Sequence, residues 1–206
     1  MILPVEFIHE LLLNKSELKE EAIENSQHYK ALHLYRSKIN TERLKMNSLT
    51  LRSWQERVLT FVDTPSDRKI IFIVGENGNE GKSFLQNYIL QLYGSTRVFK
   101  SEITGRGTDI AHLISQEKMI ERKDIFLFNV TRAVQTYEIA YEILENIKDG
   151  DLTSLKYHAK KVAFKTPNSV IVFSNHSPYS ESLSKDRYSI WKIDKSGENL
   201  ICSPYD

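Results

Sequence analysis

The segment from Ile70 to Tyr93 constrains the fold of this chain more than any other segment. A β-branched apolar run, Ile70–Val74, leads into a loop with glycines at positions 75, 78 and 81, and a helix-like stretch follows from Phe84. A buried strand, a glycine-rich loop and a helix in this order form the setting of a phosphate-binding loop. Backbone N–H groups of the loop and the helix N-terminus can then surround an anion. The segment therefore predicts an α/β domain with a phosphate site after its first strand.

The loop is one residue longer than the common spacing G-x-x-x-x-G-K-[ST]. That spacing requires a glycine at position 76, where the chain has Glu76, and Gly75 lies one position earlier. A Gly/Asn-rich turn after a buried strand is the alternative, since Asn-Gly is a frequent turn dipeptide. In the favoured interpretation, Lys82 faces the β- and γ-phosphates of ATP and the Ser83 hydroxyl ligates Mg²⁺. The predicted ATP-binding residues are Gly78, Asn79, Glu80, Gly81, Lys82, Ser83 and Phe84.

Downstream of this loop, strand and helix patterns alternate. The candidate strands are 69–74, 96–100, 125–130, 169–174 and 188–193, and the helix-like stretches are 84–93, 109–121 and 134–148. Strands alternating with helices predict a mostly parallel, five-stranded sheet with helices on both faces. The mixed segment 153–165 follows Asp149-Gly150 and predicts an antiparallel hairpin.

Residues 1–46 predict a separate helical segment. Apolar residues recur there at helical spacing, namely Phe7, Ile8, Leu11, Leu12, Leu32, Tyr35 and Ile39. Helices this short cannot bury a large core alone, so we expect them to pack on a neighbour, in the same chain or in another subunit. The chain is thus divided into a helical segment, 1–46, and an α/β domain, 47–206.

Composition excludes several classes of protein. The net charge of +1 means that any nucleic-acid contact must come from local basic patches. Cys202 is the single cysteine, which excludes an intramolecular disulfide and indicates a reducing, intracellular compartment. No apolar run approaches the ~20 residues of a membrane-spanning helix, and the first residues lack the features of a secretory signal. We therefore expect no membrane partner.

The third predicted strand ends in an amide where a P-loop ATPase needs an acid. Asn129 occupies that end, and Asp124 lies at the opposite end of the strand. An amide can accept a hydrogen bond from a metal-bound water, but it cannot act as a base. Two interpretations follow: Asn129 is native, in a slow ATPase or in one that borrows an acid from elsewhere, or it replaces an aspartate to trap nucleotide. A buried strand that merely ends in a turn residue is a further alternative.

Two polar residues at other strand ends are candidates for contact with the nucleotide. Asn175 ends the fourth strand and can orient an attacking water, although an asparagine before His-Ser-Pro is also a common turn residue. Arg187 precedes the last strand and suits a phosphate; the alternative is a surface ion pair with Asp186 or a nearby glutamate.

Basic and aromatic residues are interleaved in the predicted hairpin. Lysines can neutralise phosphates and an aromatic ring can stack on a base, a combination that suits single-stranded DNA. The predicted DNA-binding residues are Lys156, Tyr157, Lys160 and Lys161. A solvated basic hairpin is the alternative for these residues.

Together, these segments resemble the helicase half of the replication-initiator (Rep) proteins of circular single-stranded DNA viruses and related plasmids. Those proteins carry a superfamily-3 helicase domain of the AAA+ type. The resemblance covers roughly residues 28–194 and is carried, in order, by Leu51-Arg52-Ser53-Trp54-Gln55, the loop at 78–83, Phe128-Asn129-Val130-Thr131-Arg132 (which is similar to F-D-x-x-R), and the segments 141–150, 154–157, 167–175 and 183–188.

The resemblance implies a role for each candidate residue. Lys82, Asn129, Asn175 and Arg187 form the implied catalytic set, with Asn175 as the sensor asparagine and Arg187 as an arginine finger acting on a neighbouring subunit. Ser83 and, through water, Asn129 are the implied Mg²⁺ contacts, and Lys156 belongs to the DNA-binding hairpin. A homo-hexameric ring on single-stranded DNA is implied, with 1–46 as its oligomerisation segment. If the source is a virus of a eukaryote, the implied location is the host nucleus.

The leading interpretation is an ATP-dependent 3′→5′ DNA helicase module of a rolling-circle replication initiator, with ATP and Mg²⁺ as cofactors. The alternative is a nucleotide-gated DNA-binding and assembly module that hydrolyses ATP weakly or not at all, because Asn129 replaces the acid. A P-loop kinase is a third possibility, but no Arg-rich lid insertion is present. The nicking domain of the family is absent, so the chain is expected to be a helicase fragment or a relative that lost the nuclease.

Overall fold

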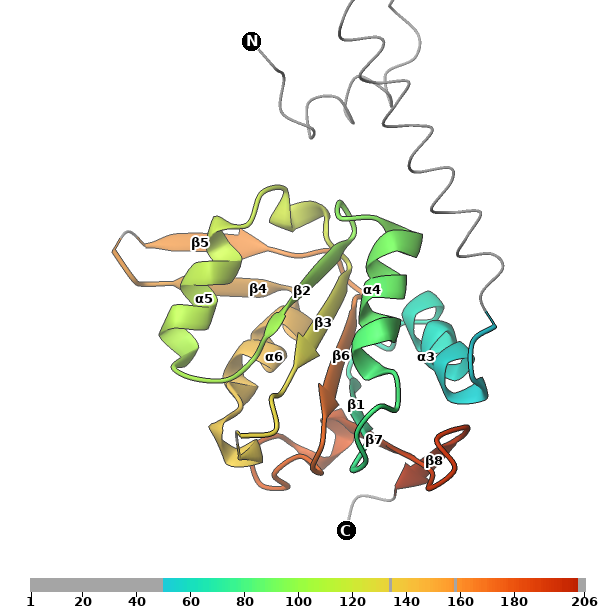
Figure 1. Cartoon of the computed structure of the whole chain (residues 1–206). Coiled ribbons are helices and arrows are strands. Elements are labelled where there is room, and N and C mark those ends of the chain that lie inside the picture. The colour runs from blue at the N-terminus through green and yellow to red at the C-terminus, as the bar shows by residue number, and fades with distance from the viewer. Residues whose placement is uncertain (1–49, 134, 158, 204–206) are drawn as a thin grey trace, which may run out of the picture. The chain divides into compact units, whose positions relative to one another are not determined.

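The computed structural model describes residues 50–133, 135–157 and 159–203. The helical segment predicted over 1–46 lies outside the described residues. A six-stranded sheet with the order β2-β3-β6-β1-β7-β8 forms the centre of the α/β domain (Figure 1). Its strands are β1 (Ile70–Val74), β2 (Val98–Glu102), β3 (Ile125–Asn129), β6 (Ser169–Ser174), β7 (Tyr188–Ile193) and β8 (Leu200–Ser203).

The predicted parallel arrangement is confirmed, and the predicted number of strands is wrong by one. Five strands pair in parallel, whereas β8 returns antiparallel along β7 at the edge of the sheet. The turn before β8 is organised by Asp194, whose carboxylate accepts hydrogen bonds from Ser196, Glu198 and Asn199. These hydrogen bonds lower the pKa of Asp194. The added strand is short and partly exposed, so it carries little hydrophobic signal.

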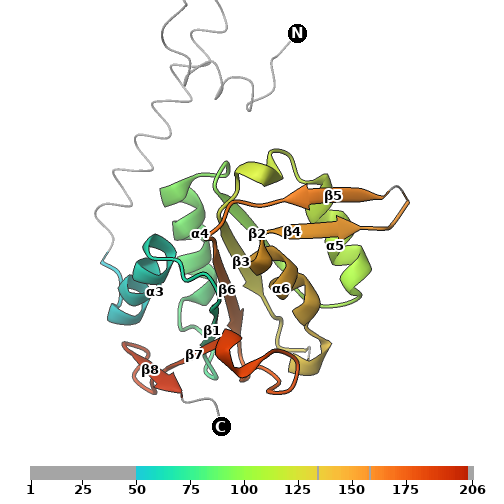
Figure 2. The same ribbon diagram turned by 180° about the vertical axis from the view of Figure 1, so that it is seen from behind.

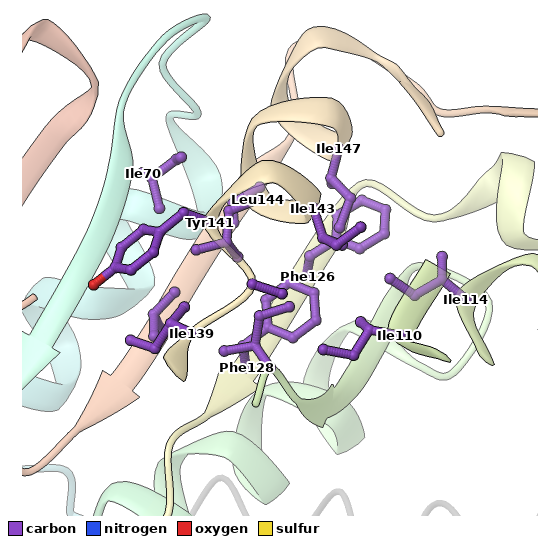
Figure 3. Packing of buried hydrophobic residues seen from close by; sticks show 14 of the residues in the cluster. Ile70, Ile110, Ile114, Phe126, Phe128, Ile139, Tyr141, Ile143, Leu144 and Ile147 are labelled. Atoms are coloured by element: carbon purple, nitrogen blue, oxygen red, sulfur yellow. The ribbon is translucent and has the colours of Figure 1, made fainter. Parts of the chain in front are cut away.

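Four α-helices cover the two faces of the sheet within the described part of the chain (Figures 1 and 2). On one face α3 (Ser53–Asp63) and α4 (Lys82–Tyr93) pack on the side chains of Ile125 and Leu127. On the other face α5 (Gly107–Gln116) and α6 (Tyr141–Asp149) pack on Phe126 and Phe128 (Figure 3). Successive residues of β3 thus point to opposite faces and both faces are apolar, as in a parallel sheet that is buried on both sides. No described helix is long and apolar enough to cross a membrane.

A second, two-stranded sheet lies on the side of α5 and α6. Strand β4 (Asp151–Ser154) pairs antiparallel with β5 (Lys160–Ala163), which confirms the predicted hairpin. One side chain from each strand, Leu152 and Val162, is buried in the same core cluster as α5 and α6. The hairpin is therefore anchored by its base, and the described part of its tip, residues 155–157 and 159, extends beyond the central sheet.

Lys148, near the end of α6, is buried beside the residue that precedes the central strand β6. Its side chain is 3% exposed, and its ammonium donates a hydrogen bond to the carbonyl oxygen of Asn168. Burial lowers the pKa of Lys148 to about 8, an effect that Asp67 partly opposes and Arg187 reinforces. An unfolded lysine has a pKa of about 10.4, so the unfolded chain retains this proton at pH values where the folded chain loses it.

The free energy of unfolding should therefore rise as the pH increases from about 8 to about 10. The sign follows from linkage, because in that window the unfolded state binds more protons than the folded state. Urea unfolding at several pH values, compared with the Lys148→Met variant, isolates this contribution. Methionine has a similar length and no charge, so the variant should show a smaller rise. Identical pH profiles for the two proteins would contradict the assignment.

Candidate functional site

A cleft opens at the carboxyl edge of the sheet, where three parallel strands end side by side. The loop after β1, Asn129 at the end of β3 and Asn175 after β6 meet there, because β1 and β3 both pair with β6. The cleft has a volume of about 480 Å³ and is lined by residues 77–84, residues 129–132 and Asn175. The structure thus brings together all the predicted ATP-binding residues, Asn129 and Asn175.

The loop passes into α4 through a left-handed residue. Gly81 is the N-cap of α4 with φ = 91°, a conformation that side chains rarely adopt. A Cβ atom at this position would also lie 2.9 Å from Nε2 of Gln55. The loop therefore requires glycine at 81 for its backbone angle, and this angle directs the N-terminus of α4 into the cleft.

Lys82 is held at the centre of the cleft by three oxygen atoms. Its Nζ donates to the carbonyl oxygen of Gly75 at 2.6 Å and to Oδ1 of Asn175 at 3.1 Å. The third partner is the carboxylate of Glu80, whose Oε2 lies 2.8 Å from Nζ. The ammonium of Lys82 and the amide of Asn175, which were predicted separately to face the nucleotide, are therefore in direct contact.

The carboxylate of Glu80 lies inside the loop, where an anion is expected. Glu80 is 5% exposed, and its Oε1 accepts a hydrogen bond from the backbone N–H of Asn77 at 3.1 Å. A Cβ atom on Gly75 would lie only 1.9 Å from Glu80 Oε2, so the loop closes around this carboxylate. A backbone N–H and an ammonium converging on an anion are the groups that bind nucleotide phosphates. The loop therefore fits a phosphate, which would compete with Glu80 for the same partners.

The Glu80→Gln variant should consequently bind ATP about tenfold more tightly, because the carboxylate no longer competes for Lys82. A charge-assisted hydrogen bond contributes roughly 1.5–3 kcal/mol, and about 1.4 kcal/mol corresponds to tenfold in affinity. Calorimetric titration with ATP measures the change. Glu76→Gln is the matched control, since this glutamate of the same loop is exposed and lies 4.0 Å from Lys192. An unchanged or lower affinity of Glu80→Gln would contradict the competition.

The remaining polar groups of the cleft fit Mg²⁺ bound with a nucleotide. Ser83 and Asn129 both line the cleft, as the sequence predicted for the metal contacts. Within the described residues, no group of three or more His, Cys, Asp or Glu side chains converges to hold a metal alone. Mg²⁺ usually keeps several waters and takes only one or two protein ligands beside substrate phosphates. A hydroxyl and an amide are therefore a sparse but compatible set.

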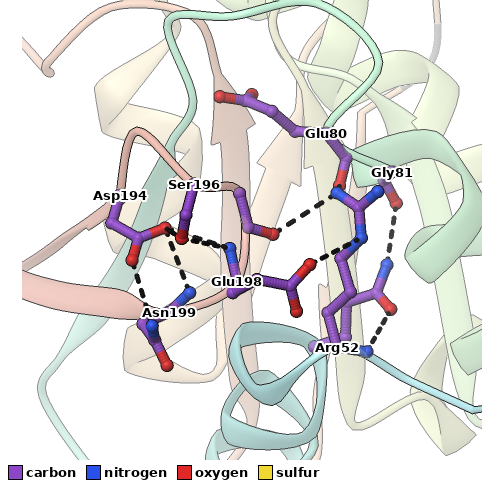
Figure 4. Close-up of polar contacts among 9 residues, drawn as sticks. Arg52, Glu80, Gly81, Asp194, Ser196, Glu198 and Asn199 are labelled. Carbon is purple, nitrogen blue, oxygen red and sulfur yellow. Dashed lines mark hydrogen bonds and ion pairs between the residues drawn. The ribbon is translucent and has the colours of Figure 1, made fainter.

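Two residues at the start of α3 support the loop from behind. Arg52 Nη1 donates to the carbonyl oxygens of Glu80 at 3.2 Å and Gly197 at 3.3 Å, and Gln55 Nε2 reaches the carbonyl oxygen of Gly81 at 3.5 Å. The Glu80 side chain points away from Arg52, so only its backbone is held there (Figure 4). The sequence marked Arg52 and Gln55 as part of a shared motif without assigning them a role, and their role here is to fix loop carbonyls.

Arg132, for which the sequence predicted no role, also lines the cleft. Its Nη2 would lie 3.0 Å from a Cβ atom on Gly78, which puts the guanidinium against the loop. Arg132 is exposed, and among the described residues none forms an ion pair with it. An arginine of this kind suits a phosphate because its charge and planar donors are available.

Arg187, the predicted arginine finger, lies elsewhere. It is 6% exposed, and its guanidinium pairs with Asp149 at 2.7 Å and with Glu145 at 3.2 Å, both on α6. Asp186, which the sequence offered as its partner, pairs instead with Arg68 at 2.5 Å. The structure therefore does not bring Arg187 to the cleft of its own chain. A role on a neighbouring subunit stays a prediction, and it would require these two ion pairs to open.

The hairpin presents its aromatic tip to solvent, whereas its lysines have partners within the chain. Tyr157 is 79% exposed, and its ring packs against that of His112 in a T-shaped arrangement with 5.2 Å between the ring centroids. Lys156 pairs with Asp109 at 2.6 Å, and this hydrogen bond raises the pKa of Lys156 and lowers that of Asp109. Lys161 pairs with Asp151 at 3.1 Å, and Lys160 donates to the carbonyl oxygen of Ser115. A nucleic acid would have to compete with these partners.

Comparison with known proteins finds relatives among the replication proteins of plant viruses and their satellites. Para-Rep C3 of Milk vetch dwarf C3 alphasatellite is 32% identical over 143 residues, which cover 68% of this chain and 47% of the relative. The master replication protein of Banana bunchy top virus is 32% identical over 162 residues, covering 76% and 52%. The master replication protein of Milk vetch dwarf virus is 28% identical over 139 residues, covering 68% and 44%. This chain thus spans about half the length of the curated relatives it matches, and no protein-family model matches it.

Proposed function

Because this chain belongs to the replication-initiator (Rep) family of circular single-stranded DNA viruses, we propose that it is the ATP-dependent DNA helicase module of such an initiator. The observation that carries the proposal is the loop around Lys82, whose ammonium and backbone already hold an anion at the end of β1. The open cleft beside it, about 480 Å³ in volume, supports a nucleotide as the natural occupant.

In this proposal three cleft residues and the N-terminus of α4 bind the phosphates, the metal and the attacking water. Lys82 and the N-terminus of α4 bind the β- and γ-phosphates, Ser83 ligates Mg²⁺, and Asn175 orients the water next to Lys82. Mg²⁺, when bound, neutralises charge that develops on the phosphate oxygens. The contact between Asn175 and Lys82 supports these roles. A water bound to the amide of Asn175 would lie close to the phosphates that Lys82 binds.

The finer assignments are also part of the proposal. The mostly parallel sheet with helices on both faces is compatible with a superfamily-3 helicase of the AAA+ type. A hexameric ring on single-stranded DNA, 3′→5′ movement and an oligomerisation role for residues 1–46 rest on the family resemblance. The relatives are named after plant viruses and their satellites, which supports an activity inside the host cell. A location in the nucleus rests on the family resemblance.

The test is the rate of ATP hydrolysis with and without single-stranded DNA. A helicase module should hydrolyse ATP and should be stimulated by the DNA. ATP binding and DNA binding without turnover would contradict the helicase and favour the alternative, a nucleotide-gated assembly module. Asn129 is the specific observation behind that alternative, since an amide at the end of β3 cannot act as a base.

The hairpin is the proposed DNA contact. Replacing Lys156, Lys160 and Lys161 with alanine should weaken single-stranded DNA binding equally for all sequences. Each phosphate contact that is lost should flatten the slope of log affinity against log salt by about 0.7. Fluorescence anisotropy at several salt concentrations measures both effects. Lys195→Ala, at an exposed lysine in the turn before β8, is the matched control. If the affinity and the slope stay unchanged, the hairpin is not the DNA contact.

A further inference from the structure

The cleft lacks a carboxylate that is free to serve the metal. Among the described residues that line it, Glu80 is the only acid, and its two oxygens already bind Lys82 and the backbone of Asn77. Asn129 stands where an acid is needed. If the chain holds a hydrated Mg²⁺ with its nucleotide, another carboxylate has to approach from a neighbouring element.

The register of the sheet places Glu102 beside Asn129. Strands β2 and β3 are parallel, and the Cα partners include Val98 with Ile125 and Glu102 with Asn129. Neighbouring strands lie about 4.8 Å apart, and side chains alternate between the two faces. Val98 and Ile125 both belong to the core cluster on the α3 and α4 side. Four residues further along each strand, Glu102 and Asn129 therefore share that same side.

A contact with α4 fixes the height of Glu102 along the sheet. Lys100 Nζ donates to Oδ1 of Asn87 at 2.6 Å. Lys100 therefore lies beside the second turn of α4, at a similar position along the strand direction. Ser83 lies four residues before Asn87, which is about 6 Å along the helix axis. Glu102 lies two residues after Lys100, which is about 6.6 Å along the strand in the same direction. Glu102 thus ends level with Ser83, the predicted metal ligand.

The carboxylate of Glu102, unlike that of Glu80, is free to accept hydrogen bonds from metal-bound waters. It is exposed at the end of β2, and within the described part of the chain no cation pairs with its carboxylate. A glutamate side chain is long enough to reach across one strand spacing toward the position in front of Asn129. The carboxylate therefore combines a suitable position with a charge that no partner neutralises.

We propose that Glu102 supplies the carboxylate that Asn129 lacks, accepting hydrogen bonds from waters on the nucleotide-bound Mg²⁺. This inference rests on the proposed nucleotide site. Glu102 is a positioning residue in this role, because it acts on the metal through water. Mg²⁺ retains several bound waters in proteins. A carboxylate that accepts hydrogen bonds from those waters raises the affinity of the site for Mg²⁺ without contacting the ion.

Mn²⁺ binding to the protein–ADP complex, followed by electron paramagnetic resonance, tests the proposal. Glu102→Gln should weaken Mn²⁺ binding about tenfold or more, whereas ADP affinity without metal should change less than about twofold. Adding Asn129→Asp to Glu102→Gln should restore Mn²⁺ affinity, since the double variant again has one carboxylate at this place, now on β3 instead of β2. Glu56→Gln, at an exposed carboxylate of α3, is the control and should bind Mn²⁺ like the parent.

The outcomes separate this inference from the proposed function. Metal-free ADP binding by the parent, together with unchanged Mn²⁺ affinity in Glu102→Gln, overturns the role of Glu102 and leaves the nucleotide site standing. A parent that binds no ADP overturns both. Failure of Asn129→Asp to restore metal affinity in the double variant also contradicts the proposal, because the loss would then reflect damage to the sheet edge.

Discussion

Lys82→Ala should lower the affinity for ATP by about 100-fold or more. Lys82 is the one ammonium among the described residues that line the cleft, and it lies at the bottom of the phosphate loop between Gly75, Glu80 and Asn175. Two charge-assisted hydrogen bonds to phosphate, at roughly 1.5–3 kcal/mol each, account for a loss of this size. Calorimetric or fluorescence titration with ATP gives the change directly.

The Lys82→Ala variant needs a control for Glu80, whose carboxylate loses its ion-pair partner. Removing the ammonium alone leaves Glu80 buried without its cation, which can destabilise the loop. The double variant Lys82→Ala/Glu80→Gln removes both charges, so loss of ATP binding in this folded protein is attributable to the missing cation. Lys192→Ala removes a lysine on β7 near Glu76 and should bind ATP like the parent. Normal ATP affinity in the double variant would mean that the loop does not bind phosphate.

Asn129→Asp should raise the rate of ATP hydrolysis by about tenfold or more, with ATP affinity changing less than about threefold. A carboxylate at the end of β3 can accept a proton and can accept hydrogen bonds from metal-bound waters, whereas the amide does only the second and more weakly. Steady-state kinetics separate the maximal rate from the affinity. If Glu102 contributes as proposed, the relative gain should be larger when Glu102→Gln is also present.

Asn129→Ala is the control for this prediction. Alanine removes the amide without adding a base, so it should not accelerate turnover. An Asn129→Asp variant that is no faster than the parent would show that the acid at this position is not what limits hydrolysis.

The sequence predicted the parts of the fold that depend on local hydrophobic pattern. The runs Ile70–Val74 and Ser169–Ser174 are buried throughout, and such continuous apolar runs between turn residues identify central strands. Leu200–Ser203 was missed because a short, half-exposed edge strand has no such pattern. The strand follows a turn that Asp194 organises through hydrogen bonds to Glu198 and Asn199, which is a local polar signal and not a hydrophobic one.

The candidate site was predicted less completely than the fold. Motif position and strand ends predicted three of its residues, and the structure brings them together in one cleft: Lys82, Asn129 and Asn175. Arg132 was missed because its place against Gly78 depends on the path of the chain after β3. Glu102 was missed because its partnership with Asn129 depends on sheet register, which no local spacing reveals. Arg187 was predicted to serve as an arginine finger, but its ion pairs with two carboxylates of α6 depend on tertiary packing, which the local sequence does not show.

A crystal structure of the protein with Mg²⁺ and a non-hydrolysable ATP analogue is the decisive test of phosphate binding by the loop. We expect the β- and γ-phosphates to lie in the loop, accepting hydrogen bonds from Lys82 Nζ and the backbone N–H of Asn77. The carboxylate of Glu80, which now binds both groups, should be displaced from the loop. An analogue bound outside the loop, with Glu80 still on Lys82, would mean that the loop is not the phosphate site.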